Sequence, residues 1–265
     1  MAESSLLETH LAEGVFRLNL NRPEKRNALS LEMIAAISNA LDEAAQNSDA
    51  RVIVIAANGP VFSSGHDLKE LTAARNSADR GREFFDQTMR SCSAMMQKIV
   101  NHRLPVIAEV RGTASAAGCQ LVASCDLAVA SEDAKFITPG VNIGLFCSTP
   151  MVALSRNVAN KHALEMLLTG EPCSARKAVE IGLVNRAVPP EEFDATVKWF
   201  TDRICAKSQM TIKTGKQAFY QQTHMPLTEA YDYCAQVMVE NMLKYDAEEG
   251  INAFLEKREA EWRDE

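Results

Sequence analysis

Residues 112–120 read Gly-Thr-Ala-Ser-Ala-Ala-Gly-Cys-Gln, a run of small residues at the start of a predicted helix at 116–124. Apolar runs typical of strands lie before it, at Val106–Val110, and after it, at residues 127–130. The first amides of a helix have no acceptor within the helix and carry partial positive charge. Small side chains let a ligand oxygen approach such amides closely. The stretch therefore predicts a site for a developing oxygen anion, although spacing alone favours tight packing of the helix.

Strand and helix patterns alternate on both sides of this stretch. Residues 15–20 alternate between apolar and polar side chains, as in a half-buried strand, whereas residues 52–55 are continuously apolar, as in a strand covered on both faces. Between these two stretches, Ser30 is placed to cap a helix. Further along the chain, residues 84–100 also have helical spacing. This alternation implies an α/β protein with a largely parallel sheet.

Strand patterns nearly stop after Pro150, and helical patterns continue to the end of the chain. We divide the chain near Pro189 and Pro190 into a core at residues 1–190, which holds the candidate pocket, and a helical region at residues 191–265. The last helical pattern predicts an amphipathic tail with one apolar side, formed by Ile251, Phe254, Leu255 and Trp262.

Composition excludes several classes of protein. The 265 residues are 46% hydrophobic and 24% charged, as in a globular protein, and a net charge of −7 gives no general attraction to nucleic acid or acidic membranes. No apolar stretch is long enough to span a membrane, and residues 1–14 resemble no targeting signal. Seven scattered cysteines without a C-x-x-C pair argue against disulfides and zinc, and favour a reducing cytoplasm.

Several motifs occur in a fixed order along nearly the whole chain. They are Asn21-Arg22-Pro23 with Arg26-Asn27-Ala28-Leu29, residues 62–71 (FSSGHDLKEL), residues 112–120, Cys125-Asp126, residues 136–144 (FITPGVNIG), Leu168-Thr169-Gly170 and Gly182-Leu183-Val184. In this order they resemble the crotonase (enoyl-CoA hydratase/isomerase) family, which includes enoyl-CoA hydratase domain-containing proteins. The resemblance implies a ClpP/crotonase-like spiral of ββα units with a C-terminal helical region that forms a homotrimer or a dimer of trimers.

The resemblance also implies an acyl-CoA thioester as the ligand, as in fatty acid metabolism. Backbone amides at His66 and Ala117 would form the oxyanion hole, and a basic cluster would hold the phosphates of coenzyme A. A solvated loop of charges is the alternative that composition favours for this cluster. The other expected substrate-binding residues are Ala28, Ser64, Asp67, Leu68, Ala116, Gly118 and Pro139, with Phe254 and Lys257 in the C-terminal helix, and the basic cluster is Arg22, Lys25 and Arg26.

The chain departs from the hydratases at two positions. By the resemblance, Gln120 and Gly140 stand where hydratases carry the glutamates that activate water and deliver a proton. An amide has no useful basicity and glycine has no side chain, so ordinary hydration is expected to be poor. Single-glutamate isomerases keep the second position, which is also empty here.

Other groups are candidates for the missing acid or base. The His66 side chain is expected to face a loop or solvent, and Asp67 is expected to cap the following helix. Cys147 and Cys119 are expected to be buried and inert. Glu70 and Glu109 reach the site only if the loops allow it.

Two functions remain open. One is an acyl-CoA enzyme of hydratase or isomerase type whose oxyanion hole stabilises a thioester enolate; the other is a non-catalytic acyl-CoA binding or sensing protein. We expect no metal and no covalently bound cofactor, with coenzyme A present only as part of the substrate. Nucleic acid is discounted because residues 42–47 lack a lysine stripe, and a serine triad is discounted because Ser64, His66 and Asp67 are almost contiguous.

Overall fold

The structure is a computed structural model that describes residues 5–265. Residues 1–4 lie outside the described residues. They include Glu3 and belong to the stretch of residues 1–14 that we expected to resemble no targeting signal. No helix within residues 5–265 has both the length and the apolar character needed to cross a membrane.

The described chain is built from ten strands, eleven α-helices and three 3-10 helices. The strands are β1 (Leu7–Ala12), β2 (Val15–Leu20), β3 (Val52–Ala57), β4 (Val61–Ser63), β5 (Val106–Val110), β6 (Thr113–Ser115), β7 (Leu127–Ser131), β8 (Lys135–Ile137), β9 (Cys173–Ser174) and β10 (Arg186–Val188). The α-helices are α1 (Leu31–Gln46), α2 (Leu68–Ala74), α3 (Arg82–Val100), α4 (Ala117–Ser124), α5 (Pro150–Asn157), α6 (Asn160–Thr169), α7 (Ala175–Glu180), α8 (Phe193–Cys205), α9 (Gln209–Gln222), α10 (Leu227–Met242) and α11 (Tyr245–Glu256). The 3-10 helices are η1 (Pro23–Lys25), η2 (Pro139–Ile143) and η3 (Pro190–Glu192).

Two sheets form the core. The larger has the strand order β1-β2-β3-β5-β7-β10 and the smaller has the order β4-β6-β8-β9. The consecutive strand pairs β3/β4, β5/β6 and β7/β8 each place one strand in each sheet, which is the expected spiral of strand pairs. Only β1 and β9 run antiparallel to their neighbours within the described sheets, so the expected largely parallel arrangement is confirmed.

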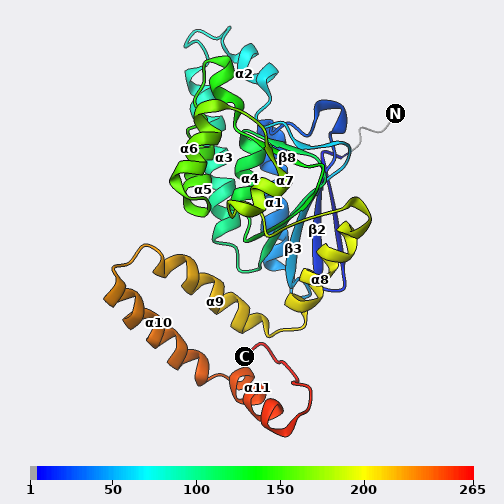
Figure 1. Cartoon of the computed structure of the whole chain (residues 1–265), viewed down its shortest axis with the longest axis vertical. Helices are drawn as coiled ribbons and strands as arrows, with labels where there is room; N and C mark the ends of the chain where they lie inside the picture. Colours follow the sequence, from blue (N-terminus) through cyan, green and yellow to red (C-terminus); the bar gives the residue numbers. More distant parts are fainter. Residues whose placement is uncertain (1–4) are drawn as a thin grey trace.

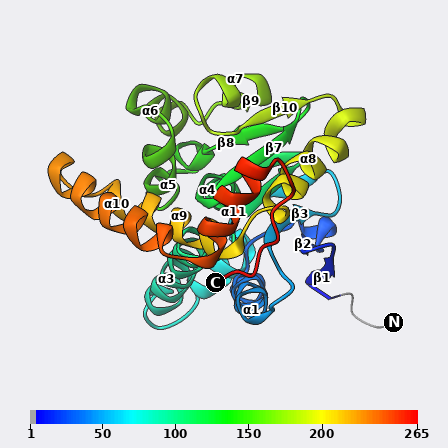
Figure 2. The same ribbon diagram turned by 90° about the horizontal axis from the view of Figure 1, so that it is seen from below.

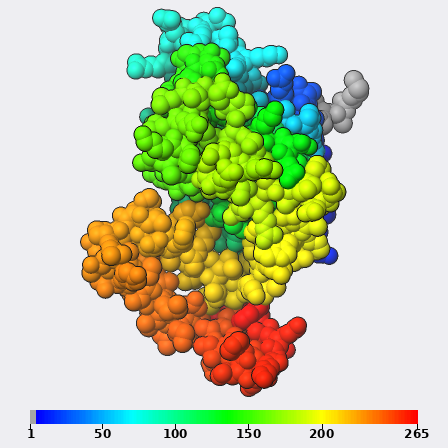
Figure 3. All heavy atoms as spheres, in the orientation of Figure 1, coloured from blue at the N-terminus to red at the C-terminus, as the bar shows by residue number. Residues whose placement is uncertain are grey.

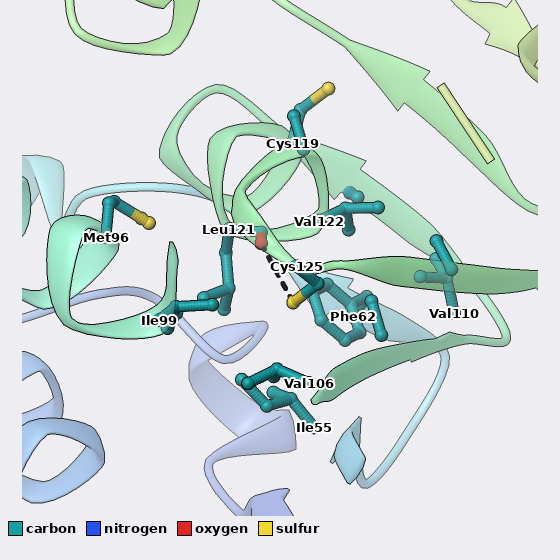
Figure 4. Packing of buried hydrophobic residues seen from close by; sticks show 14 of the residues in the cluster. Ile55, Phe62, Met96, Ile99, Val106, Val110, Cys119, Leu121, Val122 and Cys125 are labelled. Carbon is teal, nitrogen blue, oxygen red and sulfur yellow. Dashed lines mark hydrogen bonds between the residues drawn. The ribbon is translucent and has the colours of Figure 1, made fainter. Parts of the chain in front are cut away.

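The strand β3 shows why a continuously apolar run belongs at the centre of this fold. Ile53 and Ile55 belong to the main hydrophobic core, whereas Val52 and Val54 pack on the opposite face of the sheet with Phe193 and Val197 of α8. On the main core side, α4 packs through Leu121 and neighbouring residues onto β3 and β5 (Figure 4). The sheet is therefore covered on both faces, as the sequence indicated.

The helices α9, α10 and α11 form an arm that leaves the core. Figure 1 shows it below the sheets, Figure 2 shows α10 extending outward from the rest, and Figure 3 shows the orange and red residues of the arm below the body of the molecule. Because α8 packs on the larger sheet, the arm begins after α8, at about residue 208. The division of the chain near residue 190 stays a prediction.

One expectation for the arm is wrong. The helix α11 ends at Glu256, so Trp262 does not continue its apolar side. The chain turns back instead, and the Trp262 Nε1 donates a hydrogen bond to the Ala206 carbonyl at the start of the arm. Lys257 makes this turn possible because it adopts a left-handed conformation, with φ of 58°.

Candidate functional site

The start of α4 is formed by an unusual backbone turn at Ala116. This residue has φ of 49° and ψ of −117°, a conformation that side chains with a Cβ rarely adopt. Its amide donates to the Ile137 carbonyl at 2.8 Å, which ties the turn to the end of β8. The next amide, that of Ala117, donates to no acceptor within residues 5–265. The turn therefore presents a free donor at a helix start, as the sequence predicted.

A second segment lies directly against this turn. Gly65 has φ of 87°, and a Cβ added there would stand 2.9 Å from the Ala116 Cβ and 3.2 Å from the Ala117 nitrogen. A Cβ on Gly118 would stand 2.5 Å from the Ser63 carbonyl oxygen. Because these two glycines lack a Cβ, the segment of residues 63–65 packs directly against the start of α4. His66, the residue after Gly65, therefore lies close to Ala117. The His66 amide likewise has no acceptor among the described residues.

The loop of residues 22–29 is hydrogen-bonded to the same segment. The Ser64 amide donates to the Arg26 carbonyl at 3.0 Å, and the Leu29 amide donates to the Gly65 carbonyl at 2.8 Å. The buried side chain of Asn27 fixes the loop, because its Oδ1 accepts from the Arg22 amide while its Nδ2 donates to two carbonyls of the chain before and within β4. The basic loop and the pair of free amides thus form one continuous unit, with Ala28 inside it.

The three cations of that loop are not equivalent. The guanidinium of Arg22 pairs with Glu24, with 2.7 Å between Nε and Oε1. Lys25 and Arg26 are exposed and have no carboxylate partner within the described chain. Only Lys25 and Arg26 are therefore free to meet an anionic ligand.

Gln120 and Gly140, the two positions at which the resemblance implies glutamates in hydratases, differ in their surroundings. Gln120 is buried on α4, and its Oε1 has no hydrogen-bond partner. Gly140 lies in η2 directly after Pro139, and a Cβ there would stand 2.6 Å from the Leu145 carbonyl oxygen and 2.9 Å from the Cys147 sulfur. The space for a second glutamate is therefore filled by other atoms of the chain.

Buried polar atoms without partners gather around the turn. Five such side-chain atoms occur within residues 5–265, and four of them belong to His66, Gln120 and Thr138. Thr138 follows Ile137, which accepts from the Ala116 amide, and the Gln120 amide donates to the Ala116 carbonyl at 3.0 Å. Because buried polar groups are normally hydrogen-bonded, unpartnered atoms on three residues of these neighbouring segments are unusual.

Of the two placements expected for the His66 side chain, facing a loop or facing solvent, the structure argues against solvent. Both ring nitrogens are buried and lack partners, so the ring does not face solvent. Burial lowers the pKa of His66 below its usual range, which keeps the imidazole neutral at pH 7. Packing of its loop against α4, which the sequence pattern does not reveal, removes the ring from water.

Three carboxylates near these segments are engaged elsewhere in the chain. The Asp67 side chain caps α2 as expected, because its Oδ1 accepts from the Lys69 amide at 2.8 Å, and Leu68 begins that helix half exposed. Glu70 Oε2 accepts from the Leu31 amide at the start of α1, at 3.3 Å. Glu109 is buried and forms ion pairs with Arg17 of β2 and with Arg111, which directly follows β5.

The thiols near the site are inert, as expected. Cys119 is fully buried and points away from the core residues Ile55 and Val106 in Figure 4. Burial raises its pKa to about 12, and burial also raises the pKa of Cys147. Neither thiol is a thiolate nucleophile at neutral pH.

The two expected ligand contacts of the C-terminal helix are not brought to the site within one chain. Phe254 is 83% exposed on α11, and Lys257 ends that helix. Figure 1 places α11 at the opposite end of the molecule from α2, which follows the His66 segment. Any contact of these residues with a ligand would have to be made at the site of another subunit.

Two surface hollows lie outside the turn itself. One of about 490 Å³ runs along α2 and is lined by Leu68, Lys69 and Thr72, so it begins two residues after His66. A larger one of about 840 Å³ lies between β1 and α1 and reaches Arg22 and Glu24. The smaller hollow adjoins the site, whereas the larger one meets it only through the paired arginine.

Comparison with known proteins identifies the family of the chain. A model of the enoyl-CoA hydratase/isomerase family matches residues 10–265, and the chain belongs to this family. It is 48% identical over 253 residues to the human protein named enoyl-CoA hydratase domain-containing protein 3, mitochondrial, covering 96% of this chain and 82% of that protein. The rat protein of the same name is 46% identical over 261 residues, which cover 98% of this chain and 85% of that protein.

Solved structures give the same result for the fold. The crystal structure of human enoyl coenzyme A hydratase domain-containing protein 3 has a TM-score of 0.93 at 46% identity, covering 97% of this chain and 100% of that chain. An enoyl-CoA hydratase structure from Mycobacterium smegmatis has the same TM-score and identity, covering 98% of this chain and 99% of that one. The crotonase fold is thereby confirmed.

Sequence reasoning missed two residues of the site. Thr138, two residues before Gly140, is fully buried with an unpartnered hydroxyl. Asn27 was recognised only as part of a motif, whereas its side chain joins three backbone segments. A polar residue inside an otherwise apolar or loop motif was the available signal in both cases.

Proposed function

We propose that this crotonase-family chain binds an acyl-CoA thioester and stabilises the enolate of that thioester at the amides of His66 and Ala117. The observation that carries the proposal is the free Ala117 amide at the start of α4, held beside the His66 segment by the Gly65 contact. Preorganised donors of this kind contribute roughly 3–4 kcal/mol to stabilising an oxyanion when a single one is removed. The family relationship supplies the class of ligand.

The test is calorimetry with acetyl-CoA and crotonyl-CoA on a matched pair of variants. Ala117→Val places a branched side chain beside the amide and is expected to abolish binding, whereas Ala117→Gly keeps the amide open and is expected to retain binding. Circular dichroism checks that both variants are folded. Failure of the unaltered protein to bind any CoA thioester would refute the proposal.

Ordinary hydration is not part of the proposed activity. Gln120 is not a base, and no side chain at position 140 replaces the second glutamate. We expect slow hydration of crotonyl-CoA, and Gln120→Glu is expected to raise the rate because a positioned acid or base contributes about 10²–10⁴-fold. Rapid hydration by the unaltered protein that survives Gln120→Ala would show that another group acts as the base.

A non-catalytic acyl-CoA binding or sensing protein is the second candidate. The observation in its favour is that the carboxylates of Asp67, Glu70 and Glu109 are all engaged in caps or ion pairs. Turnover of a panel of enoyl-CoA and 3-oxoacyl-CoA thioesters distinguishes the two candidates, since both bind coenzyme A esters.

We further propose that the chain assembles as a homotrimer or a dimer of trimers. The arm carries a row of exposed apolar side chains that a single chain leaves in water, and such patches mark association surfaces. Analytical ultracentrifugation measures the assembly directly, and a monomer at micromolar concentration would refute it. The exposed large apolar residues are Leu227, Tyr231, Met238, Val239 and Met242 on α10 and Leu243 directly after it.

The cellular location is proposed only as a reducing compartment. Five of the seven cysteines are buried and all are unpaired. The rat and human relatives are named mitochondrial, whereas our sequence expectation was the cytoplasm. Cell fractionation with an antibody to the native protein decides between these two compartments.

A further inference from the structure

The strand β1 forms an open edge of the larger sheet, next to α1 (Figure 2). Within residues 5–265 it pairs with β2 alone, in antiparallel orientation. The Asn21 amide donates to the Leu6 carbonyl at 2.8 Å, so Leu6 belongs to a hydrogen-bonded pair of this ladder. Because such pairs alternate along an antiparallel ladder, the backbone groups of Thr9 and Leu11 point away from β2. Neither residue has a backbone partner on that side within the described chain.

The hollow of about 840 Å³ between β1 and α1 opens directly beside this edge. Leu7 and Thr9 line it from the strand, and the Thr9 side chain is exposed. Alternate residues of a strand share one face, so a further strand paired with β1 would place every second side chain over the hollow. On the opposite side α1 contributes a stripe of small residues with a glutamate at each end. The stripe consists of Glu32, Ala35, Ala36, Asn39, Ala40 and Glu43.

The hollow carries negative charge that no cation of the chain balances. Glu32 and Glu43 are exposed and form no ion pair within residues 5–265. Neither β1 nor α1 contains a lysine or an arginine. Among the described lining residues Arg22 is the single arginine, and it already pairs with Glu24. A ligand that fits this hollow therefore brings positive charge of its own.

We propose that the edge of β1 binds an extended segment of another protein that carries lysine or arginine at alternate positions. The backbone of the segment pairs with Thr9 and Leu11 and so adds a strand to the larger sheet. Its basic side chains enter the hollow between Glu32 and Glu43, where opposite charge selects them. Exposed edges are usually blocked by lysine, proline or a bulge, and β1 has none of these.

This surface is separate from the proposed thioester site. The hollow meets the basic loop only through Arg22, whose guanidinium Glu24 already holds. The inference therefore does not depend on the proposed function. Variants on β1 and α1 are expected to bind CoA thioesters as the unaltered protein does.

The experiment measures fluorescence anisotropy of a labelled peptide of alternating lysine and threonine, with the 6-residue length of β1. Thr9→Pro removes the outward amide and leaves the bonds to β2 in place, because proline is tolerated where the amide of an edge strand faces solvent. This variant should weaken binding about tenfold through loss of backbone pairing. Thr9→Val keeps the amide and is expected to keep the affinity.

The glutamates are tested by a matched set of neutral variants. Glu32→Gln with Glu43→Gln should weaken binding about threefold or more and reduce its dependence on salt. Glu240→Gln, exposed on α10, is the control and should change neither. A peptide with glutamate in place of lysine is expected not to bind.

Hydrogen exchange locates the peptide without any substitution. The amides of Thr9 and Leu11 should exchange more slowly when the lysine peptide is bound. Those of Glu8 and His10 already face β2 and should keep their rates. This measurement decides the question even if Thr9→Pro fails to fold.

Three results would overturn the inference. Equal binding of a peptide that is N-methylated at alternate residues would show that charge alone holds it, without a new strand. No binding of the lysine peptide, or protection that leaves Thr9 and Leu11 unchanged, would place basic segments elsewhere or nowhere on the protein. A peptide-free protein whose sedimentation changes with Thr9→Pro would show that a second copy of the chain occupies the edge instead.

Discussion

The sulfur of Cys147 lies where a side chain on Gly140 would begin, only 2.9 Å from the position of an added Cβ. The Leu145 carbonyl oxygen is closer still, at 2.6 Å. The backbone of Gly140 is not in the left-handed region, so glycine is required here by space and not by conformation.

This contact predicts that Gly140→Glu does not restore a hydratase site. The larger side chain must displace the segment from Leu145 to Cys147, and such overpacking costs about 1–3 kcal/mol of unfolding free energy. Urea unfolding of Gly140→Glu and Gly140→Ala measures the cost. Cys147→Ala in the Gly140→Ala background should recover only part of it, because the carbonyl remains. A stable Gly140→Glu variant with fast hydration would contradict the prediction.

The strained turn predicts a stabilising substitution at Ala116. Its φ of 49° and ψ of −117° belong to a region that glycine adopts without penalty. Ala116→Gly should therefore raise the free energy of unfolding by about 1 kcal/mol. Ala123→Gly, within α4, should lower it by about the same amount, since glycine disfavours helices. Destabilisation by Ala116→Gly would mean that the turn is not strained in solution.

The unequal cations of the basic loop predict unequal effects on ligand binding. Lys25→Ala with Arg26→Ala should weaken acyl-CoA binding and reduce its dependence on salt, because these side chains are free to contact phosphates. Arg22→Ala should have a smaller effect, since its guanidinium already pairs with Glu24. Calorimetry at two salt concentrations measures both variants. Equal losses in the two variants would show that the Glu24 pair opens for the ligand.

A buried ion pair connects the arm to the core, and we expect the arm to be held less firmly when this pair is removed. Lys216 on α9 reaches Asp126 with 2.7 Å between Nζ and Oδ2, and it also donates to the Ile99 and Leu104 carbonyls. Lys216→Met leaves Asp126 without its cation, and loss of one partner of a buried pair costs about 3–5 kcal/mol. Hydrogen exchange of α9 should accelerate in this variant. The exposed Lys213→Met on the same helix is the control and should leave exchange unchanged.

A buried histidine predicts a loss of stability in mild acid. His102 Nε2 lies 3.0 Å from the Leu41 carbonyl oxygen, and its Nδ1 accepts from the Leu104 amide, so the ring is neutral. Burial lowers the pKa of His102 below its usual value of 6.5. The unfolded chain therefore binds the proton more readily, and stability that is complete above about pH 6.5 falls as the pH decreases toward the folded pKa.

The pH measurement compares urea midpoints between pH 7.5 and pH 5.5. The pKa of His66 is also lowered, so His102→Gln should remove part of the pH dependence and His66→Gln another part. Carboxylates with lowered pKa values, such as Glu249 at about 2, change stability only at lower pH. A flat profile in this range would contradict the prediction.

The helices and strands that could be predicted from the sequence are those with a clear local pattern, such as a capping residue or a continuous apolar run. Ser30 caps α1 by accepting from the Met33 amide, and the apolar run of β3 lies in the middle of the larger sheet. The strands of the smaller sheet have only two or three residues each, too few to show a period. They arise because the chain returns to the same place after each strand of the larger sheet, which is a property of the whole fold.

The candidate site could likewise be predicted only in part from the sequence. The motifs predicted the free amides, but the contact between Gly140 and Cys147 depends on how a loop folds back. Burial of the His66 ring depends on the packing of two segments that are about 50 residues apart in the sequence. Such facts come from tertiary structure, which no local pattern contains.

Because most of its thiols are buried, the protein can be labelled for spectroscopy at one accessible cysteine. Cys92, Cys119, Cys125, Cys147 and Cys173 are buried, and only Cys205 and Cys234 are partly accessible within residues 5–265. Burial raises the pKa of Cys205, so a maleimide dye at neutral pH should attach first to Cys234, in the middle of α10. Fluorescence from the unmutated chain would then report directly on the movement and association of the arm.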